Sequence, residues 1–373
     1  IGNISDFYFD KRSEHAYLTG DNGTAIVSLL DFSHKETPQI ASLAGEKISF
    51  SPDKDLVFIS TESGYYLFGG DGYELLWGPI LKPENLALGN EQMATRKVER
   101  TDYVAFGINE SKVLVLHNNY GSDDDFLEIL DVQTGQEVHR IYGQNPSARF
   151  GISPDNQVLA IAGFGDGLVQ LWSVNEDKVL FNLRSHEKMV YQALFSPDGS
   201  SVATASADAS IKLWDSQSGN LLATLSGHQA AVWTIAFSVT GESLFSAGDD
   251  PEMLVWNLGT GSLERKINLP DSTQQHRFLL PSPSGRTILV ASSCYSILDC
   301  TIPWISGDLL ELDISTGQVL HKFPFATQEL VISSDGSLLA GVFIRTPEIV
   351  HFAGKPFDGE LNIKTFKSPS GNG

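Results

Sequence analysis

The residues that could carry out chemistry form only incomplete versions of known motifs. His186-Glu187 begins the His-Glu-x-x-His pattern of zinc proteases, but Val190 stands where the second metal-binding His is required. Residues 163–167 are glycine-rich, yet no helix pattern follows to provide a phosphate-binding N-terminus. No Gly-x-Ser-x-Gly nucleophile sequence occurs. The sequence therefore predicts no catalytic residue, no metal site and no cofactor.

A short acidic run offers oxygen ligands without the right spacing. Asp123, Asp124 and Asp125 are the hard ligands that Ca²⁺ prefers, but the interleaved Gly and the ligand spacing of a calcium loop are missing. We interpret the run as a solvated acidic turn.

His, Asp and Trp recur in this sequence at a fixed period. His186, Asp208 and Trp214 are each followed 42 residues later by the same residue type, at His228, Asp250 and Trp256. Three residue types in one register indicate an internal structural repeat. Within residues 190–225, apolar runs alternate with turns and predict four antiparallel strands. These strands are Val190–Phe195, Ser201–Ser206, Ser210–Trp214 and Leu221–Leu225.

A repeat of this kind needs neighbours, because one four-stranded sheet cannot bury both of its faces and a radial ring of sheets can. The pattern begins at roughly residues 4, 45, 102, 148, 190, 232, 276 and 327. We predict an all-β fold: a single β-propeller over residues 1–373 with four-stranded antiparallel blades, eight in number, with seven as the alternative. The first unit is expected to end with Pro38–Leu43 and the last with Leu361–Phe366, so that the ring closes without borrowing a terminal strand.

The repeat resembles the WD40-repeat propellers, most strongly over residues 144–260. The signature lies in Gly227-His228 with Trp256-Asn257, and in His186 with Trp214-Asp215. In that family a buried tetrad of His, Ser or Thr, Asp and Trp staples each blade, because these buried polar groups must satisfy one another. The preceding unit departs from this pattern, since Gln144 and Ala162 replace the His and the Ser or Thr. The resemblance implies two structural tetrads: His186, Thr204, Asp208 and Trp214, and His228, Ser246, Asp250 and Trp256.

Two long insertions mark one face of the expected propeller. They fall within about 79–100, between two blades, and within about 293–307, between a second and a third strand. The resemblance places both on the top face, where loops on a rigid scaffold often carry binding. The second insertion contains Trp304 and two cysteines. A disulfide between Cys294 and Cys300 would indicate an oxidising compartment, and two reduced, buried cysteines are the alternative.

Composition excludes several classes of partner. The chain has 25 basic and 46 acidic residues, a net charge of −21, so it lacks the basic surface that nucleic-acid binding needs. No apolar run nears the roughly 18 residues of a membrane helix, and no membrane insertion is expected. The acidic, lysine-poor composition leans slightly toward an exported protein, with a cytoplasmic one as the alternative. The sequence starts at Ile1 rather than Met, so a preceding segment is expected in the full gene.

The resemblance implies that one position per repeat, at the start of each first strand, lines the channel mouth. Four successive repeats place there residue types that dominate interfaces, namely Arg149, Tyr191, Trp233 and Arg277. The arginines suit an acidic or carboxylate-terminated segment, while Glu46 and Asp102 could orient a basic residue of the same peptide. The alternative is that the arginines neutralise nearby carboxylates and Trp233 packs between blades. The whole row is Ser5, Glu46, Asp102, Arg149, Tyr191, Trp233, Arg277 and Gln328.

These features together predict a non-enzymatic scaffold that binds a protein or peptide through its top face, with Trp304 as a further contact. Two alternatives stay open. One is an enzyme, a hydrolase or oxidoreductase, whose site at the channel mouth assembles from different blades. The other is a structural spacer in a larger multidomain chain.

Overall fold

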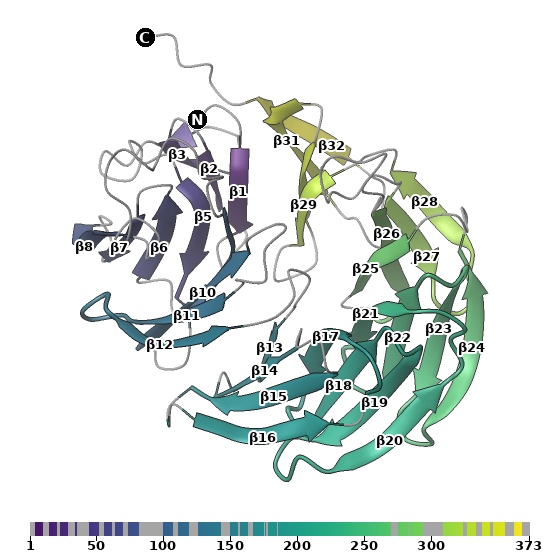
Figure 1. The fold of residues 1–373 in the computed structure, drawn as a ribbon. Helices are drawn as coiled ribbons and strands as arrows, with labels where there is room; N and C mark the ends of the chain where they lie inside the picture. The colour runs from purple at the N-terminus through teal and green to yellow at the C-terminus, as the bar shows by residue number, and fades with distance from the viewer. Residues whose placement is uncertain are drawn as a thin grey trace, which may run out of the picture. The chain divides into compact units, whose positions relative to one another are not determined.

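A computed structural model describes an all-β chain whose strands are labelled in Figure 1. The described residues are 4–9, 15–20, 23–28, 34–35, 45–51, 56–61, 64–69, 74–81, 100–106, 111–118, 126–142, 150–155, 157–162, 167–174, 176, 178–184, 186–269, 275–282, 284–293, 309–323, 327–332, 338–343, 346–354 and 362–367. In this part of the chain no helix is long and apolar enough to cross a membrane. The chain divides into two compact units, one of residues 1–142 with 328–373 and one of residues 143–327.

The unit of residues 143–327 contains four antiparallel sheets of four strands each, every one a meander in sequence order. Figure 1 shows the first strands β13, β17, β21 and β25 on the inner side of these sheets and the fourth strands on the outer side. The strands are β13 (Phe150–Ile152), β14 (Val158–Ile161), β15 (Leu168–Ser173), β16 (Lys178–Arg184), β17 (Val190–Phe195), β18 (Ser201–Ser206), β19 (Ser210–Asp215), β20 (Leu221–Ser226), β21 (Val232–Phe237), β22 (Ser243–Gly248), β23 (Glu252–Asn257), β24 (Ser262–Asn268), β25 (Gln275–Pro281), β26 (Thr287–Ser293), β27 (Leu309–Asp313) and β28 (Val319–Phe323).

The other unit repeats the same four-stranded meander. Its strands are β1 (Ile4–Phe9), β2 (His15–Gly20), β3 (Gly23–Ser28), β4 (His34–Lys35), β5 (Gly45–Phe50), β6 (Leu56–Thr61), β7 (Gly64–Gly69), β8 (Glu74–Leu81), β9 (Arg100–Phe106), β10 (Lys112–Asn118), β11 (Phe126–Asp131), β12 (Glu137–Tyr142), β29 (Thr327–Ile332), β30 (Leu338–Phe343), β31 (Thr346–Gly354) and β32 (Asn362–Lys367). Within this unit β31 contacts β1, so the C-terminal sheet lies beside the N-terminal one.

The core lies between neighbouring sheets rather than within one. Ala203, Ile211 and Leu213 of one sheet pack with Val232 and Leu254 of the next, and all five are buried. Similar apolar clusters join the sheets before and after this pair. A sheet with a neighbour on each side is therefore buried on both faces, which explains why β18, β19, β22 and β23 are buried along most of their length.

A recurring turn joins the third and fourth strands. In one sheet the Asp215 Oδ1 atom accepts hydrogen bonds from the backbone N–H groups of Gln217 and Ser218 and from the Ser218 hydroxyl. Gly219 closes this turn with a φ of +70°, a conformation that favours glycine. The glycine also lies against Phe181 on the fourth strand of the preceding sheet, so the turn fixes how two sheets pack.

The predicted strands of residues 190–225 agree with β17 to β20 to within one residue at every boundary. The final strand, β32, is likewise offset by one residue from the prediction. The first sheet differs from the prediction, because its fourth strand lies at His34–Lys35, and residues 38–43 lie outside the described residues. The first insertion also starts later than predicted, since Pro79 to Leu81 continue β8.

Candidate functional site

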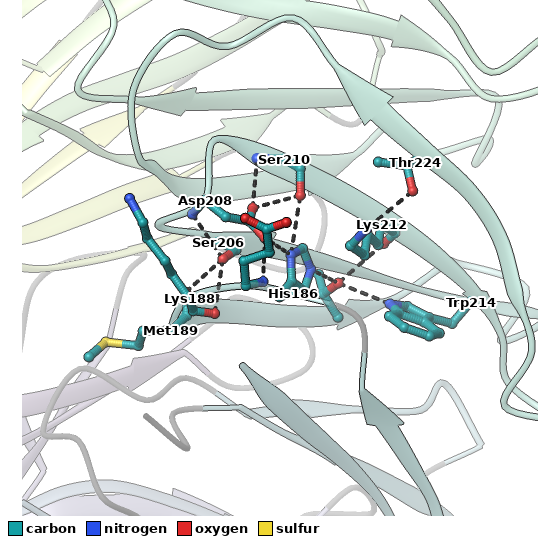
Figure 2. Close-up of polar contacts among 11 residues, drawn as sticks. His186, Lys188, Met189, Ser206, Asp208, Ser210, Lys212, Trp214 and Thr224 are labelled. Carbon is teal, nitrogen blue, oxygen red and sulfur yellow. Dashed lines mark hydrogen bonds and ion pairs between the residues drawn. The ribbon is translucent and has the colours of Figure 1, made fainter. Parts of the chain in front are cut away.

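The first predicted tetrad is a chain of hydrogen bonds across one sheet. His186 stands just before β17, and its Nδ1 atom is 2.9 Å from the Asp208 Oδ2 atom, in the turn after β18. Its Nε2 atom is 2.8 Å from the Thr204 Oγ1 atom, which accepts the Trp214 indole N–H at 3.0 Å. Figure 2 shows Ser210 as an additional member, whose hydroxyl donates to Asp208 at 2.6 Å. The structure therefore joins β18, β19 and the segment before β17 through these four side chains.

The second tetrad repeats this arrangement in the next sheet. The His228 Nδ1 atom lies 2.5 Å from Asp250 Oδ2, and its Nε2 atom lies 2.7 Å from Ser246 Oγ. The Trp256 indole N–H donates to the same hydroxyl at 2.8 Å. All four residues are buried. In both sheets the polar groups of the tetrad satisfy one another.

Burial determines the charge of these histidines. Burial lowers the pKa of His186 below its ordinary value of 6.5, although the adjacent Asp208 acts in the opposite direction. The pKa of His228 is lowered for the same reason. Burial also opposes ionisation of Asp208, but hydrogen bonds from Ser210, His186 and the Glu187 backbone lower its pKa to about 2. Each histidine is thus neutral at pH 7, and the Nδ1–H of His186 donates to the ionised carboxylate of Asp208.

The sheet before these two lacks the network at the positions that the structure describes. Trp172 is buried, but Ala162 provides no hydroxyl for its indole N–H. Gln144 and Asp166, which the sequence places at the other two positions, lie outside the described residues. The replacement of the histidine by Gln144 in this repeat therefore stays a prediction.

The positions predicted to line the channel mouth share one backbone feature. At each of six of them, two residues of a first strand face one residue of the second strand, which makes a β-bulge. These six positions are thus structurally equivalent, and a bulge is a common device for re-aiming a side chain. The extra residues are Ser5, Glu46, Asp102, Tyr191, Trp233 and Arg277.

Two of these bulge residues are brought into direct contact. The rings of Tyr191 and Trp233, on the adjacent strands β17 and β21, are stacked with their centroids 3.7 Å apart. Both side chains are partly exposed. The Trp233 indole N–H donates to the Asp249 Oδ1 atom at 2.7 Å, and Asp249 is exposed in the turn between β22 and β23. The stacked pair and this carboxylate form what we call the aromatic pair site.

The residue after Tyr191 holds the two sheets of the aromatic pair site together. Gln192 is buried, and its Oε1 atom accepts a hydrogen bond from the backbone N–H of Ile235 at 2.7 Å. This bond joins β17 to β21 close to both bulges. The relative position of the two rings is therefore fixed by the backbone as well as by ring contact, which favours a preorganised surface.

The other predicted site residues are placed only in part. Glu46, Asp102 and Arg277 stand at their bulges, and their side chains lie outside the description. Arg149 and the insertion residues Cys294, Cys300 and Trp304 lie outside the described residues. Among described residues, no group of three or more His, Cys, Asp or Glu side chains could hold a metal ion.

Sequence reasoning missed Asp249 and Gln192. A comparison of the repeats contains a signal for the first, because the equivalent residue 42 positions earlier is Ala207. Both residues make the same backbone bond, Ala207 N–H to Met189 and Asp249 N–H to Ala231. Asp249 is therefore a departure from its repeat, whereas no simple pattern singles out Gln192.

Comparison with known families agrees with this geometry. The model of the WD40 family, described as WD domain, G-beta repeat, matches residues 177–215 and 219–257. Residues 177–257 contain two WD40 repeats. The matched residues run from the outer strand β16 of one sheet to β23. They include both tetrads and end before the outer strand β24. WD40 domains commonly bind proteins and are usually non-enzymatic. No curated protein significantly matches the chain.

Proposed function

We propose that this WD40 protein is a non-enzymatic scaffold that binds a protein or peptide at its row of first-strand bulges. The observation that carries the proposal is the stacking of Tyr191 on Trp233 at two successive bulges. The fold does not require aromatic residues there, since Ser5 and Glu46 occupy equivalent bulges. Partly exposed Tyr and Trp side chains on a fixed backbone are the residue types that contribute most to protein interfaces.

The neighbouring repeats extend the binding row. Arg149 precedes the pair and Arg277 follows it in repeat order, and their guanidinium groups suit an acidic or carboxylate-terminated segment of the partner. Glu46 and Asp102 suit a basic residue of the same segment. Trp304, in the insertion after β26, is a further contact on the same top face.

The same proposal joins both units into one ring of eight blades over residues 1–373. Two observations support it: each unit is built of the same four-stranded meander, and β31 contacts β1 within the first unit. Both insertions, after Leu81 and after Ser293, then fall on the top face with the bulges. A Cys294–Cys300 disulfide would stiffen the second insertion and accord with export.

Binding measurements on bulge variants test the proposed function. The partner is identified by pull-down from the source organism, and its affinity is measured for the wild type and for the double variant Arg149→Ala with Trp233→Ala. A hot-spot loss of about 2 kcal/mol corresponds to roughly thirtyfold weaker binding. Val239→Ala is the control, because Val239 is exposed at the opposite end of β21. Unchanged affinity in a folded double variant would place the binding surface elsewhere.

A further inference from the structure

We infer that the aromatic pair site binds a basic side chain of the partner, with arginine preferred over lysine. This inference rests on the proposed function and goes beyond it, since it assigns the chemistry of one partner residue. Asp249 is the group that decides it. Its Oδ1 atom accepts the Trp233 indole N–H at 2.7 Å, which holds the carboxylate beside the stacked rings.

The carboxylate of Asp249 has no cation to neutralise it within the described part of the chain. Asp249 is exposed, and no Lys, Arg or His of the described residues forms an ion pair with it. Its hydrogen bond to an uncharged indole leaves the negative charge in place. An exposed and positioned carboxylate of this kind can accept hydrogen bonds from a cationic side chain.

The fold itself does not need a carboxylate at this position. Ala207 occupies the equivalent turn in the preceding sheet and donates the same backbone hydrogen bond as Asp249. The bulge at Trp233 is likewise formed elsewhere by residues as small as Ser5. Trp233 and Asp249 thus occur together at positions where other repeats have small residues. We therefore assign them a role in binding rather than in folding.

Aromatic rings and a carboxylate side by side match the chemistry of a guanidinium group. An arginine can donate in-plane hydrogen bonds to a carboxylate and also contact an aromatic ring through its planar face. A lysine ammonium can make the ion pair but has no planar face to stack. The net charge of −21 further favours the approach of a cationic side chain to this site.

Selection from a peptide library tests the inference without knowledge of the natural partner. A phage-displayed library of short random peptides is selected on the immobilised full chain, and enriched peptides are synthesised for affinity measurement. We expect enrichment of Arg, and less strongly of Lys, over Asp and Glu. Asp249→Asn, which keeps the shape and the acceptor for Trp233, should weaken the selected peptides by roughly tenfold. Glu264→Gln, at an exposed position on β24, is the matched control for loss of one negative charge.

The outcomes separate this inference from the proposed function. Peptides that lose affinity with Trp233→Ala and keep it with Asp249→Asn would overturn the basic side chain and leave the binding row intact. Enrichment of acidic peptides would do the same. Peptides unaffected by Trp233→Ala, or a selection with no enrichment, would count against both. An equal loss in Glu264→Gln would show that overall charge, and not Asp249, attracts the peptide.

Discussion

At the scale of single residues, the tetrads make stability depend on a few buried polar contacts. Trp214→Ala removes a large buried side chain and should lower the free energy of unfolding by about 3–5 kcal/mol. His186→Ala should cost about 1–3 kcal/mol, because Asp208 and Thr204 lose a hydrogen-bond partner. Chemical denaturation of each variant measures both values. Wild-type denaturation midpoints in the two variants would show that the network does not stabilise the sheet.

The same histidines give stability a pH dependence of defined sign. The pKa values of both histidines lie below 6.5 in the folded state. As the pH falls below 6.5, the unfolded chain therefore binds more protons than the folded chain does. Stability should therefore decrease between neutral pH and about pH 5. A second loss should follow as the pH falls from 3.8 toward 2, through protonation of Asp208. In urea titrations across this range, His186→Gln should flatten the first decrease, and an unchanged slope would show that His186 is not its source.

A buried carboxylate at residue 311 is unfavourable for folding. Glu311 is fully buried, and its Oε1 atom has no hydrogen-bond partner, although His321 Nδ1 lies 2.6 Å from Oε2. The register of the third strand against the second places Glu311 at the position that Leu213 and Val255 occupy in two other sheets. Glu311→Leu should thus raise the free energy of unfolding by about 1 kcal/mol or more. A lower denaturation midpoint would indicate that the charge is needed where it stands.

The sequence alone was enough to predict the tetrads but not the roles of Asp249 and Glu311 or the stacking of Tyr191 on Trp233. The tetrads could be predicted because His, Asp and Trp recur in register, and a buried polar network tolerates few substitutions. Asp249 and Glu311 could not be predicted as easily, because each is a single departure from a repeat and its role depends on neighbours brought near by folding. The stacking of Tyr191 on Trp233 could not be predicted either. The repeat spacing places the two residues at equivalent positions of adjacent sheets, but it does not determine how their rings are oriented.

At the scale of elements, strand boundaries were predictable wherever turns carried a clear signal. A Ser-Pro-Asp-Gly turn joins β17 to β18, and an Asp-x-x-x-Gly turn joins β19 to β20. The predicted and observed boundaries of these four strands agree to within one residue. The short β4 escaped prediction because His34–Lys35 is polar and brief, whereas the apolar residues that follow suggested a later strand. The first insertion was assigned from about residue 79, whereas β8 continues to Leu81 and contains Pro79, which an edge strand tolerates.

The turn between third and fourth strands gives a prediction at this scale. In Gly219→Ala, the new Cβ atom would lie 2.7 Å from Phe181 Cγ, and the φ of +70° is unfavourable for any residue with a Cβ. The variant should lose more than about 1 kcal/mol of unfolding free energy. Gly261→Ala is an informative control, because its φ is +65° and nothing lies within 4 Å of the added atom. Calorimetry should show the larger drop in melting temperature for Gly219→Ala, and equal drops would mean that backbone strain alone is responsible.

At the scale of the molecule, the proposed single ring predicts that neither unit is stable alone. Sheets whose cores lie between neighbours expose an apolar face wherever the series is cut, and apolar exposure costs about 25 cal/mol per Å². The full chain should therefore unfold in one transition. A fragment of residues 143–327, which retains both tetrads and the aromatic pair site, should melt at a lower temperature or aggregate. Differential scanning calorimetry of the chain and the fragment compares them directly. Two transitions in the full chain, with one matching the fragment, would mean that the units fold independently and that the eight sheets do not close into one ring.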